Sequence, residues 1–194
     1  MGKILCFVTD DFADFEITLA LHLIRNIGKR EVLSIGYDLS PVISQSGLQY
    51  KPDLLIKEAI PLDDIEGLIL PGGPIRAQKD ELTNLIKKLD RDEKLLAAIC
   101  FGPQYLGRAG VLDNTSFTTS CSIETINSLD VVDPFPRENY VDKRIVRDGH
   151  RITAHGLAFI DFAFELLDFL HVFQGNEQER NRLFHTITNG VICT

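Results

Sequence analysis

The sequence contains no apolar run approaching the roughly 20 residues that a membrane-spanning helix needs. Its opening stretch, MGKILCFVTDD, has too short an apolar segment for a secretory signal and no small-residue cleavage site. The 194 residues carry a net charge of −8, and a uniformly acidic surface repels phosphate groups. We therefore expect a cytoplasmic protein with neither a membrane nor a nucleic acid as partner.

Paired motifs for metals and cofactors are also missing. The cysteines, Cys6, Cys100, Cys121 and Cys193, are too far apart in sequence for a CxxC redox or zinc spacing. No His-x-x-His, GxGxxG or P-loop sequence occurs either. We expect no metal and no cofactor, and in a reducing compartment we expect free thiols.

The order of hydrophobic patterns indicates one α/β domain over residues 1–194. Apolar residues make up 44% of the chain, enough for a sizeable core. Strands and helices alternate, which is typical of a parallel sheet in a doubly wound sandwich. The expected strands are 3–8, 32–37, 67–70, 95–99 and 117–119, with a hairpin within 140–154 and a hairpin or edge excursion over 41–58. The expected helices are 15–27, capped by Gly28, then 81–89, 102–109, 159–173 and 176–187.

Cys100 lies at a predicted strand-to-helix turn, within the sequence AICFGP. A small residue stands two positions before it and Gly102 stands two positions after it, which is the pattern of a nucleophile elbow. The dipole of the following helix would favour the thiolate and lower the pKa of the thiol. The alternative is a buried structural cysteine at a strand end, and the spacing alone does not decide between the two.

Two other segments belong to the same edge of the predicted sheet, because active sites of such folds gather at the carboxyl ends of the strands. Gly73 ends the sequence PGG after one strand, and its backbone N–H could form an oxyanion hole with that of Phe101. Glu16 opens the first helix and could share a proton with the Cys100 sulfur. The alternatives are an ordinary glycine-rich turn and a first-turn glutamate that complements the helix dipole.

The combination of DDFADFE, LILPGG and LLAAICFGP resembles the ThiJ/PfpI superfamily, which is class I glutamine amidotransferase-like. The likeness runs over residues 3–170 and is nearest to the branch of the parkinsonism-associated redox protein. The resemblance implies a flavodoxin-like sandwich, with helices on both faces of a mostly parallel sheet, and a homodimer. It also implies that Cys100 is the nucleophile, Glu16 its protonated partner, and Gly73 and Phe101 the backbone donors.

The sequence departs from the family at the residue expected to act as the catalytic base. Ser120 stands where the nearest members have histidine, and Phe101 stands where the protease-like branch has it. Ser120 cannot take up a proton near neutral pH as histidine can. His155 is the candidate accessory base, with a solvent-facing or capping histidine as the alternative. Cys121, beside Ser120, is either a half-buried free thiol or a partner for a reversible disulfide with Cys100.

Two functions remain open at this point. The first is a glyoxalase-, deglycase- or amidase-like enzyme in which Cys100 attacks a small reactive carbonyl or amide-type substrate. The second is a redox-responsive stress protein in which an oxidant converts Cys100 to sulfinic acid with little turnover. A glutaminase subunit would need a His-x-Glu pair, whereas the segment here is His155-Gly156-Leu157.

Overall fold

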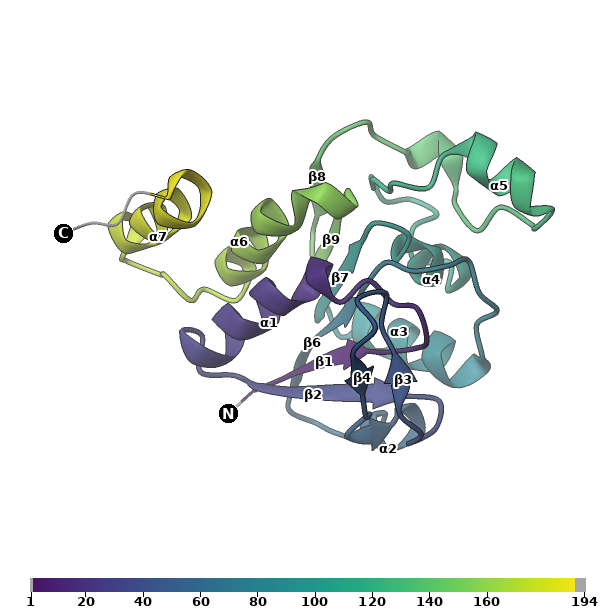
Figure 1. Cartoon of the computed structure of the whole chain (residues 1–194), viewed down its shortest axis with the longest axis horizontal. Helices are drawn as coiled ribbons and strands as arrows, with labels where there is room; N and C mark the ends of the chain where they lie inside the picture. Colours follow the sequence, from purple (N-terminus) through teal and green to yellow (C-terminus); the bar gives the residue numbers. More distant parts are fainter. Residues whose placement is uncertain (1, 191–194) are drawn as a thin grey trace.

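The computed structural model describes residues 2–190 and is built around a seven-stranded sheet (Figure 1). Its strands are β1 (Lys3–Phe7), β2 (Glu31–Gly36), β5 (Leu54–Leu55), β6 (Ile65–Leu70), β7 (Leu95–Ile99), β8 (Ile145–Asp148) and β9 (Arg151–Ala154). The order across the sheet is β5-β2-β1-β6-β7-β9-β8. Neighbouring strands are parallel except for β8 and β9, which form the predicted antiparallel hairpin.

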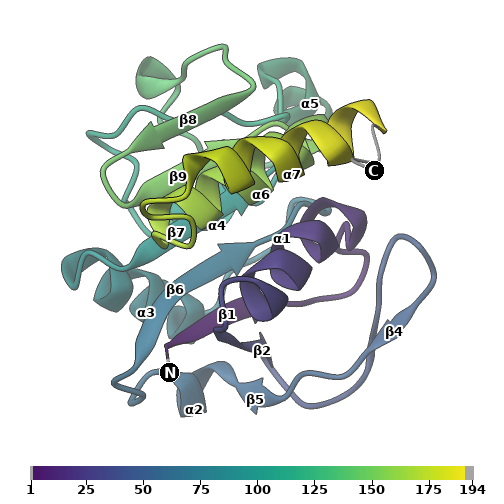
Figure 2. The ribbon, with the colours of Figure 1, turned by 90° about the vertical axis from the view of Figure 1, so that its left-hand side faces the viewer.

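Helices cover both faces of this sheet (Figure 2). One face carries α1 (Phe15–Asn26) and α6 (Phe159–Phe169), with α7 (Glu177–Asn189) packed against α6. The other carries α2 (Ile56–Ala59), α3 (Asp80–Arg91), α4 (Pro103–Arg108) and α5 (Ile123–Leu129). Successive side chains of a strand point to opposite faces of the sheet. In β1, Leu5 packs into the core on one face and Cys6 into the core on the other. The predicted flavodoxin-like α/β sandwich is confirmed.

The excursion over 41–58 holds more structure than the sequence indicated. Strands β3 (Val42–Ile43) and β4 (Gln49–Tyr50) pair as a hairpin outside the main sheet. The chain then returns to the sheet as the edge strand β5 and forms the short helix α2. Both of these elements were missing from the prediction because each spans too few residues for a periodic pattern.

The predicted strand over 117–119 is wrong. Phe117 makes only an isolated bridge to Tyr140. The Thr118 N–H donates to the Thr153 hydroxyl at 2.9 Å instead of to a strand backbone. Strand β9 occupies the place beside β7, and β8 forms the edge beyond it, so this segment lies outside the sheet.

The ends of two helices also differ from expectation. Helix α1 closes with the N–H groups of Ile27 and Gly28 on the Leu23 carbonyl, and the left-handed residue is Lys29, with φ of 56°. The predicted cap at Gly28 is therefore wrong. Helix α6 stops at Phe169, ahead of the left-handed His171, with φ of 54°. Within residues 2–190, no helix combines the length and apolar character needed to cross a membrane.

Candidate functional site

Cys100 follows β7 directly and adopts a left-handed conformation, with φ of 62°. This conformation is costly for a residue other than glycine and persists only where its surroundings enforce it. The Cys100 N–H donates to the Ala154 carbonyl of β9 at 2.8 Å. Gly102 makes the sharp turn feasible, since a Cβ there would lie 2.2 Å from the Leu70 carbonyl oxygen. The segment therefore has the backbone geometry of a nucleophile elbow.

Glu16 brings a carboxyl group to the Cys100 sulfur from the first turn of α1. Its side chain is 2% exposed, and its Oε2 accepts a hydrogen bond from the Gly72 N–H at 2.8 Å. A Cβ on Gly72 would lie 2.4 Å from that oxygen and 2.6 Å from the Cys100 Cβ. A Cβ on Gly156 would lie 2.7 Å from Oε1 and 3.1 Å from the sulfur. The two glycines leave the space in which thiol and carboxyl meet.

Protonation of this pair is governed by burial. Burial raises the pKa of Glu16, although its hydrogen bonds with Cys100 and Gly72 act in the opposite direction. Burial, together with the adjacent Glu16 charge, raises the pKa of Cys100 to about 12. This direction is opposite to the lowering expected from the helix dipole. Helix α4 starts only at Pro103 and has 6 residues.

Two backbone N–H groups near the turn were predicted as oxyanion donors. Within residues 2–190, those of Gly73 and Phe101 donate to no oxygen or nitrogen acceptor of the protein. That of Phe101 lies close enough to the sulfur to favour the thiolate. Gly73 has φ of 149°, and a Cβ there would lie 3.1 Å from the Asp11 carbonyl oxygen. The Phe101 N–H can also donate to a negatively charged oxygen beside the sulfur, and the Gly73 N–H remains a predicted second donor.

Ser120 also contacts the Cys100 sulfur. Its Oγ accepts a hydrogen bond from the Gly156 N–H at 2.9 Å, which leaves its own hydrogen free to donate. Donation to the sulfur stabilises the thiolate and counteracts part of the rise in the Cys100 pKa. Ser120 therefore acts as a hydrogen-bond donor and not as a base.

A pocket of ≈ 270 Å³ opens next to Ser120. His155 lines it, but in the described part of the chain its ring has no hydrogen bond to Cys100 or Glu16. The other lining residues are Thr119, Cys121, Ser122, Ile123, Glu124, Arg137 and Tyr140. Glu16, not His155, is thus the titratable side chain in contact with the Cys100 sulfur, and His155 belongs to the adjoining wall.

Cys121 is a buried thiol with 1% exposure, and its side chain packs into the core that contains α3 and α4. Cys100 contacts the core on the opposite face of the sheet. Cys6, Cys100 and Cys121 are all free thiols, so the structure holds no disulfide between Cys100 and Cys121. Burial raises the pKa of Cys121. Cys193 lies outside the described residues.

Sequence reasoning missed two residues of this site. Gly156 has no motif of its own, and only its place after a predicted strand end could have drawn attention to it. Thr119 was assigned to a strand, yet its hydroxyl donates to the Cys100 carbonyl at 2.6 Å. A threonine that bonds a distant backbone atom leaves no signal in a single sequence.

Proteins of known sequence and structure resemble this chain over most of its length. The deglycase TK1284 of Thermococcus kodakarensis is 31% identical over 155 residues, covering 78% of this chain and 89% of that protein. The isonitrile hydratase of Pseudomonas putida is 30% identical over 156 residues, covering 78% of this chain and 64% of that protein. The crystal structure of the DJ-1 superfamily protein Atu0886 from Agrobacterium tumefaciens has a TM-score of 0.79 and 29% identity, covering 96% and 99% of the two chains.

The family model that matches this sequence spans residues 2–169, from before β1 to the end of α6. That range contains the strained elbow, the buried glutamate and the glycine turn beside them. With the sandwich fold and the full-length structural match, this establishes that the chain belongs to the DJ-1/PfpI family.

Proposed function

We propose that the protein is a cysteine-dependent enzyme of the deglycase or glyoxalase type, acting on small reactive carbonyl compounds. The observation that carries this proposal is the meeting of three features at one point. These are a strained cysteine, a buried carboxyl group that contacts its sulfur, and the Phe101 N–H beside that sulfur. The curated deglycases among its relatives support the same reaction class.

The first chemical step uses each of these groups once. The Cys100 thiol gives its proton to the Glu16 carboxylate, whose raised pKa suits it to hold that proton. The sulfur attacks the carbonyl carbon, a carbon–sulfur bond forms, and the electron pair of the carbonyl moves to its oxygen. The N–H groups of Phe101 and Gly73 bind that oxygen until Glu16 returns the proton. The product of this step is a hemithioacetal.

The pocket beside Ser120 holds the remainder of the substrate in this proposal. Its wall offers the hydroxyl groups of Ser120 and Tyr140 and the His155 ring, which suit a polar carbonyl compound. A steady-state assay of methylglyoxal loss tests the proposal. Turnover by the purified protein supports it, and no turnover of methylglyoxal or glyoxal at any pH from 6 to 9 contradicts it.

The second function, oxidation of Cys100 with little turnover, is favoured by one observation. Ser120 supplies no base in place of the family histidine, and oxidation of a thiolate requires none. Peroxide would convert the thiolate to sulfenate with release of water, and a second equivalent would give sulfinate.

Limiting peroxide should oxidise Cys100 before Cys6 and Cys121, because Cys100 is partly exposed and the other two are buried. Sulfinate should survive better in Glu16→Gln, which keeps a hydrogen-bond donor, than in Glu16→Leu, which has none. Mass spectrometry of peptides measures both. Equal oxidation of Cys100 and Cys121 would contradict the first expectation, and equal survival in the two variants the second.

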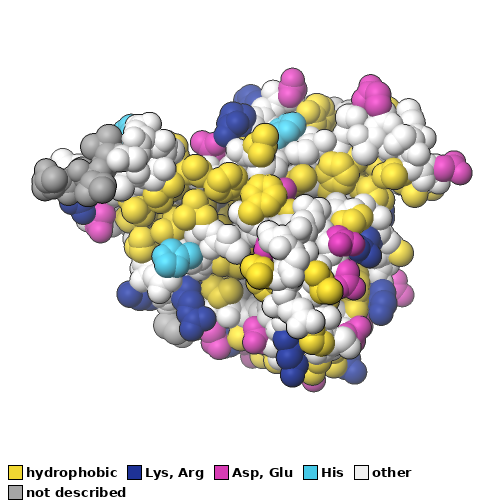
Figure 3. Space-filling view, in the orientation of Figure 1, with side chains coloured by type: hydrophobic (Ala, Val, Ile, Leu, Met, Phe, Trp, Pro, Cys, Tyr) yellow, Lys and Arg dark blue, Asp and Glu magenta, His cyan; other side chains and the backbone are white. Residues whose placement is uncertain are grey.

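A homodimer is proposed from the exposed apolar surface over α1 and α6, visible as a yellow area in Figure 3. Phe15 is 45% exposed and packs edge-on against Phe159, and Leu157 is 79% exposed. Contiguous exposed apolar surface of this kind marks interaction sites. Light scattering should give the mass of two chains, and Leu157→Glu should shift it toward one chain. A monomeric mass for the unaltered protein at high concentration would refute the dimer.

A further inference from the structure

The conformation of Cys100 is held at its carbonyl as well as at its N–H. The carbonyl oxygen accepts two hydrogen bonds, from the Ser120 N–H at 3.0 Å and from the Thr119 hydroxyl at 2.6 Å. The Ser120 donor is backbone, so Thr119 supplies the side-chain restraint. Its side chain is 2% exposed, and water therefore cannot replace the hydroxyl if it is removed.

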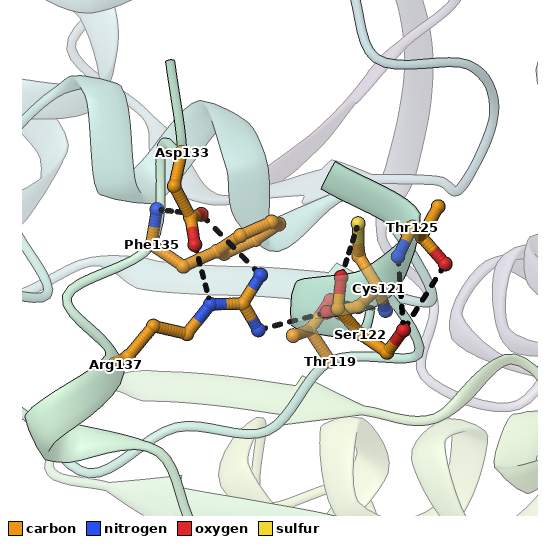
Figure 4. Close-up of polar contacts among 7 residues, drawn as sticks. All are labelled: Thr119, Cys121, Ser122, Thr125, Asp133, Phe135 and Arg137. Atoms are coloured by element: carbon orange, nitrogen blue, oxygen red, sulfur yellow. Dashed lines mark hydrogen bonds and ion pairs between the residues drawn. The ribbon is translucent and has the colours of Figure 1, made fainter. Parts of the chain in front are cut away.

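Thr119 is itself fixed by the next peptide groups (Figure 4). Its oxygen accepts a hydrogen bond from the Cys121 N–H at 3.2 Å, and the Cys121 carbonyl accepts one from Arg137 Nη1 at 2.8 Å. Arg137 is anchored by an ion pair with Asp133, with Nε to Oδ2 at 2.8 Å, and lies 4.6 Å above the Phe135 ring. Hydrogen bonds on both sides of Cys121 thus link an ion pair beside the pocket to the carbonyl of the nucleophile.

We propose that Thr119 is a positioning residue that keeps Cys100 in its strained conformation, and that Arg137 keeps Thr119 in place by holding the backbone of Cys121. A left-handed cysteine relaxes unless its surroundings over-determine it. Relaxation would move the sulfur away from the Glu16 carboxyl and the Phe101 N–H. A displacement of about 1 Å at a reacting atom can lower a rate a hundredfold without any change in the groups present.

The catalytic part of this inference rests on the proposed carbonyl chemistry. Thr119→Val keeps the shape of the side chain and removes its hydrogen bonds. We expect kcat for methylglyoxal to fall by about tenfold or more, with KM changed by less than about threefold. Thr119→Ser restores the hydroxyl and should recover most of the lost rate.

The neighbouring residue provides a matched control. Thr118 is also fully buried, but its hydroxyl has no hydrogen-bond partner among the described residues. Thr118→Val makes the same chemical change one position away and should leave kcat at the value of the unaltered protein. An equal loss of rate in both valine variants would attribute the effect to packing and overturn the positioning role.

A second measurement is independent of turnover. The pH dependence of iodoacetamide alkylation at Cys100 gives the pKa of its thiol. Burial and Glu16 raise that pKa in the native site, so loosening the elbow in Thr119→Val should lower it by at least about one unit. Thr118→Val should leave it unchanged. If methylglyoxal is not consumed by the unaltered protein but this pKa difference is found, the enzyme proposal fails and the positioning role stands.

Arg137→Gln tests the hydrogen bond between Arg137 and the Cys121 carbonyl. It also provides a test of the proposal if Thr119→Val does not fold. It removes the donor to the Cys121 carbonyl and leaves the Thr119 hydroxyl present. We expect the Cys100 pKa to move in the same direction by a smaller amount. A Cys100 pKa equal to that of the unaltered protein would show that Arg137 does not act on the elbow.

Discussion

Replacing Cys100 with serine should lower the turnover of methylglyoxal by at least about a thousandfold, since removing an enzyme's nucleophile costs this much or more. A serine hydroxyl fits the same space and can still bond Glu16, but it is a far weaker nucleophile than a thiolate. Even with its raised pKa, Glu16 is too weak a base to ionise a hydroxyl. Steady-state kinetics with methylglyoxal measure the effect.

The fold should survive this change, because the serine occupies the same elbow and its backbone hydrogen bonds remain available. Denaturant unfolding curves that coincide with those of the unaltered protein would demonstrate this. Thr118→Val, purified in parallel, controls for handling and should retain full activity. Residual turnover above about one tenth in Cys100→Ser would exclude Cys100 as the nucleophile.

Glu16→Gln should speed the alkylation of Cys100 and slow the turnover of methylglyoxal. The substitution removes the negative charge beside the sulfur, so the pKa of Cys100 should fall from about 12. A like-charge interaction at this range shifts a pKa by about one to three units, so alkylation at pH 8 should become about tenfold faster or more. Turnover should fall by about a hundredfold or more, because glutamine can neither take up nor return the proton.

The amide suits the site in other respects, since its oxygen can still accept the Gly72 N–H. Glu165→Gln on α6 is the charge-matched control, because it removes a carboxylate that pairs with Arg147 and does not contact Cys100. That variant should leave both properties unchanged. Slower alkylation in Glu16→Gln would mean that the carboxyl is neutral when Cys100 ionises, and that it shares no proton with the thiol.

Much of the site could be predicted because its parts are local. Strand β7 is a continuous apolar run, and the small residues around Cys100 are visible in the sequence. The parallel order of strands then places Glu16 and Gly73 at the same edge. These elements depend on periodicity and on glycine placement, both of which a single sequence records.

The remaining features depend on contacts between distant segments. In place of the strand expected at 117–119, β9 lies beside β7, which no local pattern could reveal. Helix α5 begins at the Ser122 cap, whose hydroxyl accepts the Thr125 N–H at 3.1 Å, but its 7 residues are too few for a clear periodicity. The rise in the pKa of Cys100 could not be predicted, because burial and Glu16 act through the assembled core.

Gly72 and Glu16, joined by one hydrogen bond, are 56 residues apart in the chain, and Gly156 and Ser120 are 36 apart. The nucleophile's surroundings therefore exist only once the loops between these segments have closed. An unfolded chain carries Cys100 as an ordinary thiol with a pKa of about 8.5, which the finished fold raises to about 12. At mildly alkaline pH an alkylating reagent will modify unfolded chains faster than native ones. The rate of Cys100 alkylation therefore reports which fraction of the chains is folded.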